Sequence, residues 1–429
     1  MTGRISRALP PVIERYGFLF ESLIDMSRSI NRSFIAGLSL WLAFSIPGFT
    51  QQGEDASRTR EQTRLQSEKA LKLKPMTENK AEQVLNWVEK TGLIGGAPRG
   101  LYPWFGSILG GGGVSIGAGY RVRFADSGAF NVLGGWSFKN YKLLQSGLEF
   151  PEFADRRVRV NLDVKWLDAP KVSFYGIGNK SSKDNKTSYL YRPTRVGPSV
   201  NVKLAKWFSL GGGAEYLRVE TGPGDEGTSI EQIFTPPITP GLGQEVSYGV
   251  SRAFAVVDWR QSPFYTRRGG LYRVDFANYT QSGSDSFSFR QLDLELQQYV
   301  PLLRENWVLV FRGLSSMTMT NGDSQVPYFM MPYLGSGETL RGYQNRRFRD
   351  RNMLLFQAEY RWTPSHFIDV ALFADAGKVA ARRGDLNFDA LHTDGGIGIR
   401  FHGPKFMALR IDAARSNEGF NLVFSTGLF

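Results

Sequence analysis

The sequence contains no cysteine and only three histidines among its 429 residues. The lack of cysteine excludes disulfide scaffolds, thiol catalysis and cysteine-rich zinc sites. Three histidines are too few for a metal centre built from several of them, and we expect neither a metal nor a cofactor. Long apolar runs are equally scarce. Only one stretch approaches the length that a membrane-spanning helix needs, which excludes a polytopic helical membrane protein.

Acidic residues are fewer than basic ones. The chain carries 52 Lys and Arg against 40 Asp and Glu, a formal net charge of +12. Proteins that bind nucleic acid gather their basic residues on one face. Here these residues are spread along the chain within alternating segments, so no nucleic-acid partner is expected.

The first hundred residues precede the alternating part of the chain. Arg28 and Arg32 stand before the apolar run 34–49, which Pro47 interrupts. A basic segment followed by a short apolar run is typical of a secretory signal peptide. We therefore predict a signal region over 1–50, in which Met26 would begin a signal of ordinary length, with a membrane anchor as the alternative. Residues 51–99 are predicted to form a periplasmic linker with one short amphipathic helix.

From residue 100 to residue 429 the dominant hydrophobic period is two. The clearest run, 157–166, alternates strictly between basic or polar and apolar side chains. Successive side chains of a strand point to opposite faces, so each such segment has one apolar and one polar face. This pattern fits either a soluble β-sandwich or an outer-membrane barrel whose apolar face meets lipid.

Three features favour the barrel. Many runs reach ten or more residues, as a tilted membrane strand requires. The best runs keep Lys and Arg on one face, and a basic side chain facing lipid at the bilayer midplane would cost about 2–4 kcal/mol. Short connections, such as 363–366, and long ones, such as 167–186, also alternate, as in outer-membrane proteins. We predict an all-β transmembrane antiparallel barrel of about 16 strands over 100–429, with 101–109 as its first strand and glycines 110–113 as the following turn.

A Gly- and Arg-rich connection at 334–352 has no alternation. Arginines folded into a lumen need acidic partners, and the following strands place Glu359, Asp369 and Asp375 on the inward face. Gly342 would let the loop backbone come close to the wall. Tyr343 would pack its ring there and keep its hydroxyl in water.

LRGY at 340–343, the strand with Glu359 and FADAG at 373–377 together resemble the BamA/TamA outer-membrane assembly-factor superfamily, also called bacterial surface antigen proteins. Residues 257–269 are similar to a D-x-R-x-x-P turn motif of that family through Asp258, Arg260 and Pro263. The resemblance implies an extracellular loop folded into the lumen, where an arginine contacts the aspartate of a D-x-G strand. The implied site residues are Arg341, Gly342, Tyr343, Glu359, Asp375 and Gly377. Family members usually carry periplasmic repeats, for which residues 51–99 are too few.

The resemblance implies a protein that aids insertion or translocation of proteins at the outer membrane and is not an enzyme. Its expected partners are outer-membrane lipid and nascent outer-membrane proteins or a secreted client. A passive pore or structural protein without protein clients is the alternative. A G-x-S-x-G pattern at 113–117 would suggest a lipase with Ser115 as nucleophile, but it lies inside an alternating strand. The histidines, at 366, 392 and 402, are expected at the surface or an interface.

Overall fold

The computed structural model describes residues 99–425 apart from residues 264, 303–305, 366 and 404–406. The chain divides into the units Met1–Thr77 and Glu78–Phe429, and all described residues belong to the second. The predicted signal region, its alternative as an anchor and residues 51–98 of the predicted linker lie outside the described residues. In the part of the chain that the structure describes, no helix is long and apolar enough to span a membrane.

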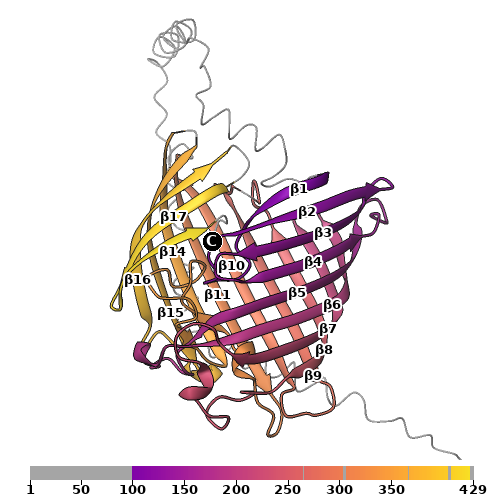
Figure 1. Ribbon diagram of the computed structural model, residues 1–429. Helices are drawn as coiled ribbons and strands as arrows, with labels where there is room; N and C mark the ends of the chain where they lie inside the picture. The colour runs from indigo at the N-terminus through magenta and orange to yellow at the C-terminus, as the bar shows by residue number, and fades with distance from the viewer. Residues whose placement is uncertain (1–98, 264, 303–305, 366, 404–406, 426–429) are drawn as a thin grey trace, which may run out of the picture. The chain divides into compact units, whose positions relative to one another are not determined.

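Sixteen strands form one antiparallel sheet that curls into the wall of a barrel (Figure 1). Each strand pairs with its neighbours in chain order, except that β11 pairs with β14. The wall strands are β1 (Gly100–Gly106), β2 (Ser115–Phe124), β3 (Gly128–Ser137), β4 (Lys142–Glu149), β5 (Val158–Phe174), β6 (Thr187–Ala205), β7 (Phe208–Pro223), β8 (Val246–Asp258), β9 (Gly269–Gln281), β10 (Phe289–Leu302), β11 (Trp307–Thr320), β14 (Asn352–Ser365), β15 (Ile368–Ala380), β16 (His392–His402), β17 (Met407–Ser416) and β18 (Gly419–Ser425). The predicted number of strands is confirmed, and the sandwich alternative is wrong because a single sheet contains them all.

Between β11 and β14 the chain forms a long loop. It contains the short strands β12 (Tyr333–Leu334) and β13 (Phe348–Arg349), which pair only with each other, and the 3-10 turn η3 (Tyr328–Met330). Three more 3-10 turns lie in the other long connections, namely η1 (Lys183–Asn185), η2 (Ile230–Gln232) and η4 (Arg383–Asp385). The longest connections therefore gather at one end of the barrel, and most of the short turns lie at the other, although the short β3–β4 and β17–β18 turns share the end with the long loops.

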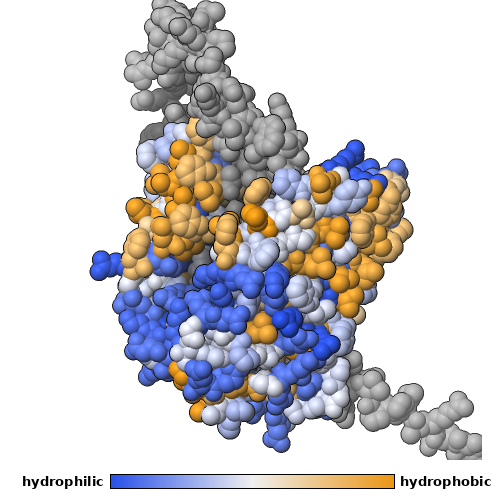
Figure 2. All heavy atoms as spheres, in the orientation of Figure 1, coloured by the Kyte–Doolittle hydropathy of each residue, from blue (hydrophilic) through white to orange (hydrophobic). Residues whose placement is uncertain are grey.

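The alternation of the sequence becomes the inner and outer faces of the wall. Leu296, Ile397 and Phe420 point outward and are 57%, 59% and 70% exposed. In Figure 2, hydrophobic side chains gather over β1–β4 and over β16 and β17, whereas the end with the long loops is hydrophilic. Exposed tryptophans stand near the short-turn end, at Trp207, Trp259 and Trp362. An apolar band with an aromatic border is the outer surface of a membrane barrel.

Two strands extend further than the sequence indicates. The predicted connection 167–186 is wrong in its first part, because β5 continues to Phe174. A bulge between Ala169 and Val172 carries the strand past Pro170, which has no N–H to give to the ladder. The predicted turn at 363–366 is likewise too early, since β14 continues to Ser365 through a second bulge. In the other direction, β1 ends at Gly106 and not at residue 109.

The long loops fill much of the lumen at their end of the barrel. The largest buried cluster joins inward side chains of β3 to β10 with loop residues such as Ile230 and Tyr328. A second cluster packs Leu334, Leu340 and Tyr343 of the long loop against Leu355 of β14. The Ser115 of the G-x-S-x-G pattern begins β2 and is buried within the barrel. It is part of a strand and not of the strand-to-helix elbow that a lipase requires.

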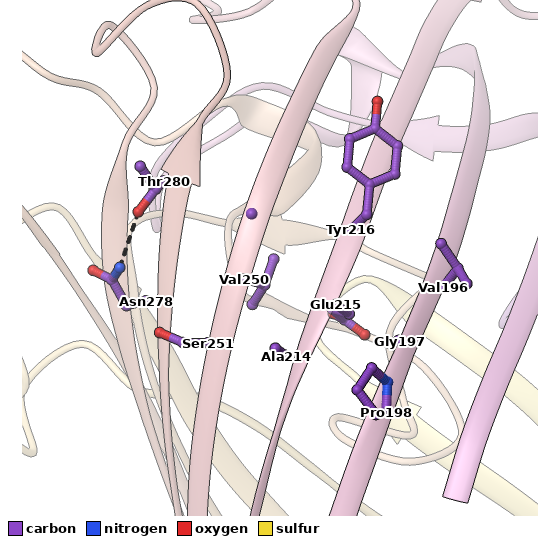
Figure 3. A pocket seen from close by; sticks show the side chains of 11 residues that line it. Val196, Gly197, Pro198, Ala214, Glu215, Tyr216, Val250, Ser251, Asn278 and Thr280 are labelled. Atoms are coloured by element: carbon purple, nitrogen blue, oxygen red, sulfur yellow. Dashed lines mark hydrogen bonds between the residues drawn. The ribbon is translucent and has the colours of Figure 1, made fainter.

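A shallow depression of about 450 Å³ lies on the outside of the wall over β6 to β9 (Figure 3). Ala214, Gly249 and Ser251 line it, and Tyr216 stands at its border. These outward side chains are small on neighbouring strands, which leaves the hollow. Because it opens away from the lumen, it is separate from the site described next.

Candidate functional site

The candidate site is formed where the long loop meets the inner wall of β14 to β17. Arg341, in the loop, is fully buried although it is a charged side chain. Its Nε and Nη2 donate to the two carboxylate oxygens of Asp375 at 2.7 and 2.6 Å. Its Nη1 donates to Glu359 and, at 3.4 Å, to Asp412. The guanidinium thus bridges β15, β14 and β17, three strands of the wall.

The ring of Phe373 supports the same guanidinium from one side. The carbon at the centre of the Arg341 guanidinium lies 3.6 Å from the centroid of this ring. A cation over an aromatic face gains electrostatic attraction, most strongly where water is excluded. Phe373 belongs to β15 and shares the inward face with Asp375. The strand therefore supplies a carboxylate and a ring to one side chain of the loop.

Three more buried arginines surround the acids that Arg341 contacts. Arg361 donates to Glu359 at 2.7 Å, and Arg400 bridges Glu359 and Asp412 at 3.0 and 2.7 Å. Arg410 pairs with Asp412 at 3.1 Å. We call these residues, together with Arg341 and Asp375, the lumen network. Removing charges from water is costly, and their mutual pairing offsets that cost only while every partner is present.

The neighbours of Arg341 in the loop are fitted closely to β16 and β17. A Cβ atom on Gly342 would lie 2.6 Å from the Cβ of Asp394 and 3.0 Å from that of Ser416. The Gly342 carbonyl accepts a hydrogen bond from the Ser416 hydroxyl at 2.8 Å. Gly342 is therefore required for the close approach of two backbones and not for an unusual φ angle.

Tyr343 lies deeper than the sequence indicates. Its side chain is buried, and its hydroxyl donates to the Asn417 side chain at 2.8 Å. The expected contact of this hydroxyl with water is wrong, because the turn between β17 and β18 covers it. Gly377 of β15 lies beside the same loop, since a Cβ there would come 3.0 Å from the Leu334 side chain.

The D-x-R-x-x-P residues lie apart from the lumen network, in the turn between β8 and β9. Asp258 accepts two hydrogen bonds from the Arg260 guanidinium, at 2.9 and 2.8 Å. Pro263 is exposed and takes no part in this pair. The structure thus brings together the first two residues of the motif and places the third on the surface of the turn.

Four residues of the lumen network were not predicted from the sequence, namely Asp412, Arg361, Arg400 and Arg410. The sequence does contain a signal for them. All four occupy the alternate positions of their strands whose side chains point inward, positions that they share with residues predicted to point inward or with small residues.

The prediction that the histidines lie at the surface or an interface is wrong in part. His402 is buried, and its ring stacks on Tyr265 at 4.0 Å. His392 is partly buried and stacks on Phe348 at 3.7 Å, while His366 lies outside the described residues.

Replacing Gly342 by alanine is expected to lower the free energy of unfolding by about 1–3 kcal/mol, because the added methyl overpacks the contact with Asp394 and Ser416. Thermal unfolding of the purified barrel in detergent measures this effect. Gly384→Ala is the matched control, since a Cβ at Gly384 meets no atom within 4 Å. Equal loss of stability in both variants would contradict the close packing at Gly342.

Comparison with known families decides the identity of this barrel. The family described as "Omp85 superfamily domain" matches residues 115–427, which is most of the chain. The chain belongs to the Omp85 superfamily. The predicted resemblance to the BamA/TamA superfamily is thereby confirmed. Omp85 proteins are barrels of the bacterial outer membrane, so the predicted location is confirmed too, and the end opposite the long loops faces the periplasm.

Two solved structures are similar to this Omp85 barrel. BamA from Haemophilus ducreyi lacking POTRA domains 1–3 matches with a TM-score of 0.57 at 13% identity, over 80% of this chain and 78% of that chain. CdiB from Escherichia coli matches with a TM-score of 0.51 at 12% identity, over 76% of this chain and 61% of that chain. At such identities the likeness shows the fold. No curated protein matches the sequence. The Omp85 chain is thus an outer-membrane barrel of the assembly and translocation type.

Proposed function

We propose that the chain inserts or translocates proteins at the outer membrane, and that its client pairs with the end strands of the sheet. β1 and β18 lie at the two ends of the strand order. Each has 7 residues, fewer than any other strand of the wall. Among the described residues, β1 pairs only with β2, and β18 pairs only with β17. These two edges are the observation on which the proposal depends.

Unpaired backbone groups explain why such edges suit a protein client. An edge strand presents free N–H and C=O groups that an added strand can satisfy. Inside a bilayer no water is present to satisfy them, so pairing is favoured more strongly there than in solution. A client strand that pairs with β1 or β18 would receive a template for its own first hairpin. Nascent outer-membrane proteins and secreted chains both fit this chemistry.

We further propose that the lumen network braces the long loop inside the barrel. Arg341, Arg346 and Arg349 of this loop are all buried. A braced loop would keep β14 to β17 rigid while the edges at β1 and β18 engage a client. A passive pore is favoured less by these contacts, because the loop occupies lumen space that a wide water channel would need.

Site-specific photo-crosslinking tests the proposed edge. A photoreactive residue is placed at Phe105 of β1 or, as the matched control, at Leu296 in the middle of the wall. Both side chains are exposed, at 69% and 57%, but only Phe105 belongs to an end strand. In lipid vesicles supplied with an unfolded outer-membrane barrel, we expect crosslinks at Phe105 and few at Leu296. We also expect the client to fold faster than in empty vesicles.

Each other outcome has a defined meaning. Equal crosslinking at both positions together with unchanged client folding would refute the proposal. Ion conductance without any effect on clients would identify a passive pore. A client recovered inside the vesicles, protected from added protease, would indicate translocation, and one embedded in the bilayer would indicate insertion.

A further inference from the structure

The turn between β8 and β9 reaches from its own strands into the lumen at the periplasmic end. Its base is closed by hydrogen bonds from the Trp259 amide to the Gly270 carbonyl at 3.0 Å and from Gln261 to Arg268 at 3.1 Å. The Asp258–Arg260 pair fixes the first residues of the turn. Beyond this base, Tyr265 and Thr266 are buried, although a periplasmic turn would normally lie in water.

Tyr265 is bound to strands that are distant in the sequence and in the sheet. Its hydroxyl donates to the Asp369 carboxylate at 3.0 Å and lies 3.1 Å from Nε2 of His402. Its ring stacks on the His402 ring with centroids 4.0 Å apart. Asp369 is the second residue of β15 and His402 ends β16, so both stand at the periplasmic end of the wall.

The charge state of Tyr265 suits this contact. Burial, and secondarily the nearby Asp369 carboxylate, raises the pKa of the Tyr265 hydroxyl to about 12. The hydroxyl therefore keeps its proton at neutral pH and remains a donor to Asp369.

Arg267 adds a second connection beside the first. Its Nη1 donates to the Tyr265 hydroxyl at 2.6 Å and to the Thr363 hydroxyl at 2.7 Å. Thr363 in turn donates to Asp369 at 2.5 Å. The turn is therefore held to β14, β15 and β16 together, through one connected set of hydrogen bonds.

The strands that this turn must cross carry an apolar surface on their lumen face. β10 and β11 lie between β9 and β14 in the sheet. Near their periplasmic ends, Tyr299, Val308 and Val310 form a buried apolar cluster. Apolar side chains on a water-filled lumen wall would be costly unless something covered them.

We propose that residues 265–267 form a strap that closes the periplasmic entrance to the lumen over β10 to β16. The strap separates the lumen network from the periplasm and leaves the entrance over β2 to β7 open. It gives a role to the D-x-R-x-x-P turn, whose paired Asp258 and Arg260 set the direction in which the strap leaves β8. The proposal concerns closure of the lumen and does not depend on the proposed protein client.

Cysteine labelling tests the strap directly, because the chain has no cysteine of its own. Val308→Cys places a single thiol on the lumen face of β11, and a charged, membrane-impermeant maleimide is added to the purified barrel in detergent. With the strap intact, labelling is expected to be slow. Tyr265→Ala should accelerate it about tenfold, because the entrance opens more often. Tyr265→Phe, which keeps the stacked ring and loses the hydroxyl, should give an intermediate rate.

A second thiol controls for entry of the reagent. Lys203→Cys lies on the lumen face of β6 and is exposed, so it should label rapidly with and without Tyr265. If Tyr265→Ala fails to fold, Arg267→Gln supplies the test. It removes the hydrogen bonds to Tyr265 and Thr363 without changing a residue of the wall. Rapid labelling of Val308→Cys in the intact barrel, or no acceleration in the folded strap variants, would overturn the proposal.

Discussion

Replacing Arg341 by alanine is expected to lower the free energy of unfolding of the barrel by about 3–5 kcal/mol. The substitution leaves Asp375, Glu359 and Asp412 buried with less positive charge to balance them. An uncompensated buried charge costs far more than an exposed salt bridge contributes. The folded and unfolded barrel migrate differently on a gel. The temperature at which the folded form converts to the unfolded one measures the loss.

One further variant separates charge from geometry at this position. Arg341→Lys keeps the positive charge and loses the planar fork that binds Asp375 through two nitrogens, so an intermediate loss is expected. Arg290→Ala is the matched control, because Arg290 is an exposed arginine in β10. Wild-type stability in Arg341→Ala, together with unchanged activity on clients, would remove the proposed bracing role.

Replacing Glu359 by glutamine should produce a loss of similar size, about 3–5 kcal/mol. Glu359 accepts hydrogen bonds from Arg341, Arg361 and Arg400, so one neutralised side chain leaves three buried guanidiniums without their shared anion. The expected barrel folds but unfolds at a markedly lower temperature or denaturant concentration.

A double-mutant cycle makes this second expectation specific. Glu359→Gln combined with Arg361→Gln removes one positive and one negative charge, so the pair should lose less stability than the sum of the single changes. The difference measures the coupling between the two side chains. Strict additivity would show that Glu359 and Arg361 do not interact in the folded protein, contrary to their 2.7 Å contact.

The expected losses of stability are linked to function by the proposed bracing of the long loop. If the lumen network braces the loop, Arg341→Ala and Glu359→Gln should weaken both stability and the handling of clients. If stability falls while crosslinking at Phe105 persists, the network serves the fold alone. The two proposals can therefore fail independently, because one concerns the inner wall of β14 to β17 and the other the edges of β1 and β18.

Much of the wall could be predicted from the sequence because a membrane strand has a simple pattern of alternating apolar and polar residues. Alternating side chains meet two different solvents, lipid outside and water or polar side chains inside. Runs such as 157–166 therefore reveal both the strand and its orientation. The errors occur where this alternation is interrupted, as at Pro170, where a bulge shifts the register and the strand nevertheless continues.

Part of the candidate site could also be predicted from the sequence, for a related reason. Glu359 and Asp375 are charged residues on the inward parity of strands, and the loop motif supplies a cation to match them. The contributions of Arg400, Arg410 and Asp412 come from β16 and β17, which are distant in sequence from the loop. No pattern within one strand states which inward side chains of other strands will share its space.

By itself, the sequence determined that this protein is a β-barrel with an apolar outside and a polar inside, because that property repeats along every strand. The tertiary structure decided how the loop and the β8–β9 turn are held inside it. Tyr265 meets His402, and Arg341 meets Asp412, only after the sheet has curved. Curvature brings strands together across the lumen, and contacts across a lumen depend on distances in space that local alternation does not encode.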